Sequence, residues 1–227
     1  MTKPIGLEAL LNLTFFGLDT ISMLGDIEDF INFSENNIDW QKRRELRCAE
    51  SECAKEQFDD PRDAAQFHAQ TIDGVTYRFE VSLAQRVRYA ALVSLITTIE
   101  WVLISLKNRA TFDIPEKPNG KSEAMHFLDT FNQAASVGLT SEIQTIETLV
   151  QIRNCIVHAA GLLASYKYGN ELRQNISACH GVKVSDINLL GESVEIEQGY
   201  LQCVVEGIKR WLPNLEMVMD EKGLLRK

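Results

Sequence analysis

Apolar residues recur at three- and four-residue steps along most of the chain, and this spacing predicts helices. The first such pattern runs from Ile5 to about Phe33, with a break expected near Gly17 or Gly25. A highly charged stretch follows, from Asp39 to about Glu56. We interpret it as a solvated helix or the flank of one, because charge runs of this kind usually face water.

A second helical region is expected to begin at Asp60 and Pro61, because proline is well suited to the first turn of a helix. Asp73 and Gly74 predict a turn after it. The next residues, VTYRFEV, fit a strand as well as a helix, and we assign helix from about Phe79. The stretch Leu83 to Leu106 has the length and composition of a long helix.

Within that helix, residues Tyr89 to Leu106 are apolar enough to raise the question of a membrane span. Glu100 lies near the centre of the stretch, and placing a carboxylate there in a bilayer costs about 2.5 kcal/mol or more. We therefore expect a helix at the centre of a soluble bundle, with no membrane partner. Glu100 must then find a hydrogen-bond donor, an aqueous cleft or a proton.

The second half of the chain predicts two more helices, a small hairpin and a closing helix. The helices span Lys121 to Ala135 and about Glu142 to Tyr166, the latter with Thr140 or Ser141 as its cap. The two strands of the hairpin are predicted at Val182 to Val184 and Val194 to Glu197, with a turn at Gly191 between them. The closing helix is predicted at Tyr200 to Leu212, where Pro213 ends it. The expected fold class is all-α.

Composition agrees with an ordinary folded protein. The chain has 227 residues, of which 45% are hydrophobic, and a net charge of −9. This acidic balance argues against unselective binding of nucleic acid, although a specific local site remains possible. Five scattered cysteines, without metal-ligand spacing, and an amino terminus unlike a signal peptide predict reduced thiols and a cytoplasmic location.

The most informative stretch is LVQIRNCIVHAAG, from Leu149 to Gly161. On a helix, Arg153 projects from the centre of an apolar stripe, where its permanent charge needs a carboxylate, a carbonyl, a partner chain or a bound anion. A polar stripe lies beside it. Asn154 and His158 are neighbours on that stripe because they are four residues apart.

This stretch resembles the motif of the HEPN family, helical domains whose active members cleave RNA. The motif is an Arg followed, after four to six residues, by a His, and Arg153 to His158 has the four-residue spacing with Asn154 directly after the Arg. Two further matches, Arg62 to His68 and Arg173 to His180, lack the long amphipathic helix around them. Glu100 would match an acidic residue that the family often carries on an earlier helix.

The resemblance implies an all-α, HEPN-like helical bundle with a small β-hairpin inserted before the last helix. Residues 81–213 would be the motif-bearing core of a single domain, and residues 1–80 an N-terminal helical elaboration. The implied activity is metal-independent endoribonuclease cleavage through attack of the 2′-hydroxyl. Arg153 and His158 would be catalytic, Asn154 and Glu100 supporting, and no metal or cofactor would be needed.

The resemblance also implies partners: an RNA substrate, a second copy that completes a composite site, and an antitoxin or other regulatory protein if the chain is a toxin or anti-phage effector. Two alternatives remain open. The domain is a non-catalytic module that binds a nucleotide, an RNA or a protein through the same groove, or it is a plain helical adaptor. In the latter, Arg153 is an ordinary arginine paired to Glu100 and His158 a surface histidine.

Overall fold

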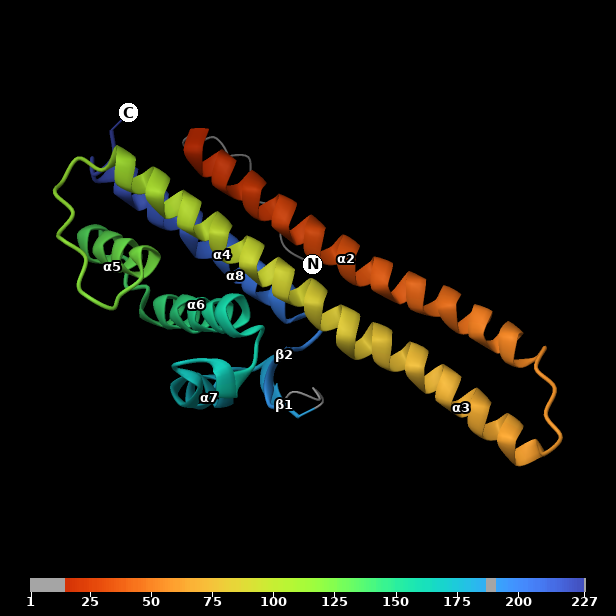
Figure 1. The fold of residues 1–227 in the computed structure, drawn as a ribbon. Helices are drawn as coiled ribbons and strands as arrows, with labels where there is room; N and C mark the ends of the chain where they lie inside the picture. The colour runs from red at the N-terminus through yellow and green to blue at the C-terminus, as the bar shows by residue number, and fades with distance from the viewer. Residues whose placement is uncertain (1–14, 187–190, 227) are drawn as a thin grey trace.

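The protein is described here from a computed structural model, which covers residues 15–186 and 191–226, with side chains from residue 20 onward. It is mostly helical, with one small antiparallel hairpin before the last helix, and the coarse fold prediction is confirmed (Figure 1). The elements are α2 (Phe15–Cys53), α3 (Pro61–Tyr77), a π-helical segment (Arg78–Leu83), α4 (Ala84–Arg109), α5 (Glu123–Ala135), α6 (Thr140–Ala159), a 3-10 turn (Leu163–Ser165), α7 (Gly169–Ser177), β1 (Val182–Ser185), β2 (Ser193–Ile196) and α8 (Tyr200–Glu221).

Helix α4 is the centre of the bundle. It packs against α2, α5, α6 and α8, and its fully buried face includes Leu92, Leu95, Ile99 and Leu103 at helical spacing. Among the described residues one continuous helical stretch, Pro61–Arg109, is long and apolar enough to cross a membrane, and half of its most apolar window is buried inside the protein. The apolar character of α4 is thus largely used in the protein core.

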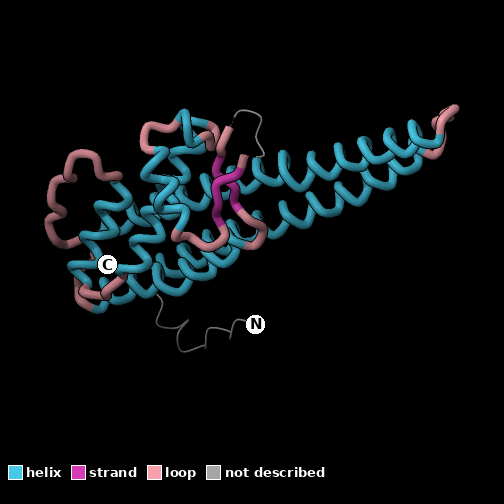
Figure 2. The backbone as a smooth tube through the Cα atoms, turned by 90° about the horizontal axis from the view of Figure 1, so that it is seen from below, coloured by secondary structure: helices cyan, strands magenta, loops and turns pink. Residues whose placement is uncertain are grey.

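Helices α2 and α3 form a long antiparallel hairpin that projects from the bundle (Figures 1 and 2). The first half of α2 packs into the main core through Leu24 and Ile31. The second half runs beside α3, which buries none of its side chains, and the two are joined to α4 by a small separate cluster of Ile38, Phe79 and Ala84. The hairpin is therefore held mainly at its base.

Both helices of the hairpin are longer than the sequence pattern predicted. Helix α2 continues without a break through Gly17 and Gly25 and through most of the charged stretch, and it ends at Cys53. The part of the predicted helix from Ile5 to Thr14 lies outside the described residues. The predicted turn at Asp73 and Gly74 is wrong, because α3 continues through it and reaches α4 by way of the π-helical segment. Side-by-side packing of the two helices offsets the low helix propensity of isolated glycines, which cost only about 1 kcal/mol each. The predicted start at Asp60 and Pro61 is confirmed.

Three further boundaries differ from the expectation. Helix α6 ends at Ala159 rather than Tyr166, because Ala160 and Gly161 adopt left-handed conformations. Its N-cap residue is Leu139, without a side-chain hydrogen bond, so the predicted cap at Thr140 or Ser141 is wrong. Helix α8 runs through Pro213, which is buried, so packing offsets the hydrogen bond that proline cannot donate. Residues 169–177, for which the sequence pattern predicted no element, form the short helix α7.

The hairpin of β1 and β2 pairs Val182 with Ile196 in antiparallel register. Helix α4 holds it in place, because the Gln85 amide both donates to the carbonyl of Ile196 and accepts from its backbone N–H, at 2.9 Å each. The Tyr89 hydroxyl donates to the carbonyl of Val194. The Val194 N–H in turn donates to the carbonyl of Gly161 at 3.0 Å, so this edge of β2 is satisfied by helix side chains and by the segment that follows α6.

Candidate functional site

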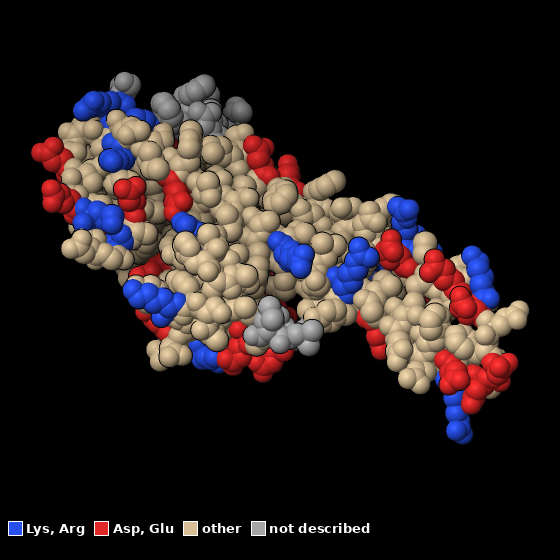
Figure 3. Space-filling model, in the orientation of Figure 1, with Lys and Arg blue, Asp and Glu red and all other residues tan. Residues whose placement is uncertain are grey.

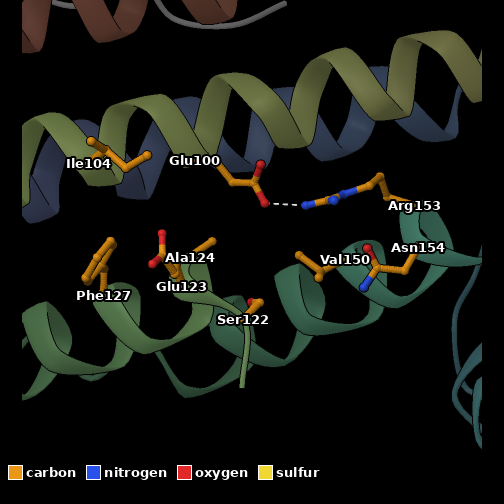
Figure 4. A pocket seen from close by; sticks show the side chains of 9 residues that line it. All are labelled: Glu100, Ile104, Ser122, Glu123, Ala124, Phe127, Val150, Arg153 and Asn154. Atoms are coloured by element: carbon orange, nitrogen blue, oxygen red, sulfur yellow. Dashed lines mark hydrogen bonds and ion pairs between the residues drawn. The ribbon is translucent and has the colours of Figure 1, made fainter. Parts of the chain in front are cut away.

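Arg153 on α6 and Glu100 on α4 form an ion pair that bridges the two helices. The Arg153 Nη2 donates to a Glu100 carboxylate oxygen, and the two side chains are 23% and 31% exposed (Figure 4). An arginine on an apolar helix face therefore has its counter-charge on the facing helix. Of the partners expected for Arg153, the structure selects the carboxylate.

The ion pair borders a cleft of about 330 Å³ between three helices. Glu100 and Ile104 line it from α4, Val150, Arg153 and Asn154 from α6, and Ser122, Glu123, Ala124 and Phe127 from the start of α5 (Figure 4). The Ser122 hydroxyl accepts a hydrogen bond from the backbone N–H of Met125, so it is the N-cap of α5. The cleft thus combines one guanidinium, two carboxylates and the positive end of a helix dipole.

The polar stripe of α6 faces α7 and the turn before it. Gln151 accepts a hydrogen bond from the Asn175 amide at 2.7 Å and donates to Glu171 at 3.1 Å. Burial raises the pKa of Tyr166, and a hydrogen bond with the Asn154 side chain partly opposes that rise. Asn154 therefore lies between the cleft and α7, where it is well placed to orient a neighbouring group.

His158 lies apart from the other three candidate residues. It is exposed in the last turn of α6 and does not line the cleft. It follows Arg153 by five positions on the helix, which corresponds to about 7.5 Å along the axis and about 140° around it. One chain therefore brings together Glu100, Arg153 and Asn154 but leaves His158 outside.

The cysteine inside the motif carries no chemistry of its own. Cys155 is completely buried, and burial raises the pKa of its thiol to about 11. Because the thiolate is the reactive form of cysteine, this side chain is inert at neutral pH. It serves as a core residue of α6.

The other Arg–His matches are placed quite differently. Arg62 and His68 are exposed on α3, near the tip of the projecting hairpin. Arg173 is paired with Glu192, and His180 is exposed beyond the end of α7. None of these residues lines the cleft beside Arg153.

The described part of the chain contains no group of three or more side chains placed to hold a metal ion. His126 and Asp129 share a face of α5, and there the His126 ring contacts the carbonyl of Pro115 at 2.7 Å and Asp129 pairs with Lys121. Both side chains thus have structural partners.

No family model, curated protein or solved structure matches this chain. The cleft must therefore be interpreted from its own geometry. Three of the nine residues that line it were candidate site residues from the sequence, and the other six were not: Ile104, Ser122, Glu123, Ala124, Phe127 and Val150. Ser122 followed by Glu123 is a recognisable start of a helix, but nothing local indicates that this start faces Arg153.

Proposed function

We propose that this protein is a HEPN-like, metal-independent endoribonuclease that acts in the cytoplasm as a homodimer. The observation that carries the proposal is the Glu100–Arg153 pair at an open cleft, on the helix that also presents an exposed His158. A toxin or anti-phage role, with an antitoxin or other regulatory protein as partner, belongs to the same proposal.

The proposed reaction needs a group that titrates near neutrality and a cation beside the phosphate. His158 accepts the proton of the ribose 2′-hydroxyl, whose oxygen attacks the adjacent phosphorus. The bond from phosphorus to the 5′-oxygen breaks, and that oxygen takes up a proton, which leaves a 2′,3′-cyclic phosphate and a 5′-hydroxyl. Arg153 stabilises the charge that accumulates on the phosphoryl oxygens, while Glu100 keeps its guanidinium oriented.

A second copy is part of the proposal because the distance along α6 separates the Arg and the His of one chain. Apolar side chains are exposed on both sides of the ion pair, with Val157 on α6 at 54% and Ile104 on α4 at 43%. A partner that covered these side chains would bring its own His158 toward the cleft. Two-fold symmetry would then form two equivalent sites or one shared site.

A non-catalytic binding module is the second candidate, and one observation favours it. Arg153, Asn154 and Ser122 line the cleft, whereas His158 does not. A nucleotide or RNA phosphate that bound there would contact Arg153 and the N-terminus of α5 without meeting a general base.

The deciding experiment is cleavage of total RNA in EDTA by the wild type, His158→Ala and His180→Ala. His180 is the matched control because it is also a solvent-exposed histidine outside the cleft. The nuclease proposal expects cleavage by the wild type and His180→Ala, with 2′,3′-cyclic phosphate ends, and a loss of at least 100-fold in His158→Ala, since general acid–base groups contribute about 10²–10⁴-fold.

Equal cleavage by His158→Ala would refute the assignment of the general base. If no variant cleaves RNA but the wild type binds a nucleotide or RNA saturably, Arg153→Ala should abolish that binding. This result would support the binding module in place of the nuclease.

A further inference from the structure

The outward face of α2 carries an unusual order of side chains. Phe33 is 72% exposed and Trp40 is 53% exposed, although both are large and apolar. Helix α2 lies along one edge of the molecule, as the ribbon and the space-filling view show (Figures 1 and 3). Its buried residues Leu24, Ile31 and Ile38 lie on the opposite side of the helix, so the face with the two aromatic residues is turned away from the core. Two large aromatic residues on a free helix face indicate an interaction surface.

The aromatic residues belong to a regular heptad pattern. Asp26, Phe33, Trp40 and Arg47 are spaced by seven residues, and all four are exposed. Residues at this spacing drift by only about 20° per repeat around a straight helix, so they form one nearly axial stripe. Such a stripe is the geometry by which two long helices pack side by side.

Charge is distributed along the stripe in two halves of opposite sign. The half before the aromatic pair is acidic, with Asp26 and Asp29, and the half after it is basic, with Arg43, Arg44 and Arg47. All five side chains are exposed, and within the described residues none of them forms an ion pair. Arg44 instead lies over the Trp40 ring, 5.8 Å from its centre.

This order is complementary to itself in the antiparallel direction. We propose that the outward face of α2, which we call the α2 stripe (Asp26, Asp29, Phe30, Phe33, Asn36, Asn37, Trp40, Arg43, Arg44 and Arg47), is a docking surface for a second copy of this chain.

In the proposed dimer the two-fold axis is perpendicular to α2 and passes between Asn36 and Asn37. Each residue then faces the one equally far on the other side of the axis. Phe33 faces the partner's Trp40 at the centre, and the two outer layers pair Asp29 with the partner's Arg44 and Asp26 with the partner's Arg47. Two-fold symmetry doubles each of these contacts, which gives four ion pairs around an aromatic centre. A parallel arrangement would place like charges together.

This interface is distinct from the one that the nuclease proposal uses. The α2 stripe contains neither α6 nor any residue of the cleft, so a dimer through His158 would not be disturbed by changes in the stripe. The two proposals therefore succeed or fail separately.

Charge reversal with complementation tests the pairing. Asp29→Arg carries only basic residues at positions 29 and 44, and Arg44→Asp carries only acidic ones. Each variant alone should dimerise at least about tenfold more weakly than the wild type in analytical ultracentrifugation, because like charges then face each other. An equimolar mixture should form a heterodimer with the affinity of the wild type, because the basic residues at positions 29 and 44 of one chain then face the acidic residues at positions 44 and 29 of the other. Circular dichroism provides the check that both variants remain folded.

Disulfide trapping tests the register. Asn37→Cys places two thiols about 1.5 Å apart along the axis, on either side of the two-fold, so mild oxidation should give a covalent dimer. Asn32→Cys is the matched control: it is also exposed, but it lies five positions before Asn37 and about 140° around the helix from it. The native Cys48 residues of the two copies would be about 35 Å apart and should not crosslink the wild type.

The proposal is overturned if Asn37→Cys crosslinks no faster than Asn32→Cys, or if the mixture of charge variants stays as weakly associated as its components. It is also overturned if the wild type is monomeric while it binds single-stranded RNA in a way that Arg44→Asp abolishes. That last outcome would assign the stripe to RNA.

Discussion

The joint between the hairpin and the bundle depends on a buried ion pair, and its removal is the sharpest test of this fold. The Arg88 guanidinium donates to both carboxylate oxygens of Glu35, at 2.6 and 3.0 Å, and to the carbonyl of Ile196 at 3.1 Å. The Arg88 and Glu35 side chains are only 12% and 11% exposed. One side chain thus connects α4 to α2 and to β2.

Arg88→Met should lower the free energy of unfolding by about 3 kcal/mol. Breaking a buried pair costs about 3–5 kcal/mol because the remaining charge is unpaired, and the residual exposure places this case at the lower end. For a chain of this size the same loss corresponds to a decrease of about 6–12 °C in Tm. Urea denaturation followed by circular dichroism measures it, with the exposed Arg86→Met as the matched control, expected within about 0.5 kcal/mol of the wild type.

A double variant distinguishes the cost of an unpaired buried charge from the cost of lost side-chain packing. Glu35→Leu with Arg88→Met removes both charges, so it should be more stable than Arg88→Met alone. The reasoning is refuted if Arg88→Met changes the free energy of unfolding by less than 1 kcal/mol, or if the double variant is as destabilised as the sum of the single changes.

Three further predictions concern the core. Burial raises the pKa of the Cys155 thiol from 9.0 to about 11, so above pH 9 this thiol loses its proton more readily in the unfolded chain than in the folded one. Between pH 9 and 11 the free energy of unfolding of the wild type should therefore fall by up to about 1.4 kcal/mol per pH unit more than that of Cys155→Ala, as parallel urea titrations would measure. Phe131→Ala, at a fully buried site, should cost about 3–5 kcal/mol in urea, and a loss below 1 kcal/mol would contradict the packing described. Gly161→Ala should lower Tm because φ is +83° and the new methyl group would meet the Tyr89 ring at 2.9 Å. Its control Gly25→Ala lies in open space on a helix and should raise the free energy of unfolding by about 0.5–1 kcal/mol, and equal changes in the two variants would refute this account.

The sequence predicted the presence of most elements better than their ends. The centre of α4, the hairpin of β1 and β2, and the start of α3 at Asp60 all depend on residues close together in the chain. Helix ends depend on distant contacts as well. The continuation of α3 through Gly74 and of α8 through Pro213 is stable because neighbouring helices bury those segments or lie beside them.

For the candidate site, the sequence by itself determined that Arg153 lies on an apolar helix face and needs an opposite charge, because helical periodicity and a permanent charge are local properties. Only the tertiary structure decided that Glu100, 53 residues earlier, supplies this charge, and that the start of α5 completes a cleft beside the pair. It also decided that His158 stays outside the cleft of its own chain. The physical reason is that the packing of α4, α5 and α6 sets which side chains meet, and this packing depends on the whole core rather than on any single segment.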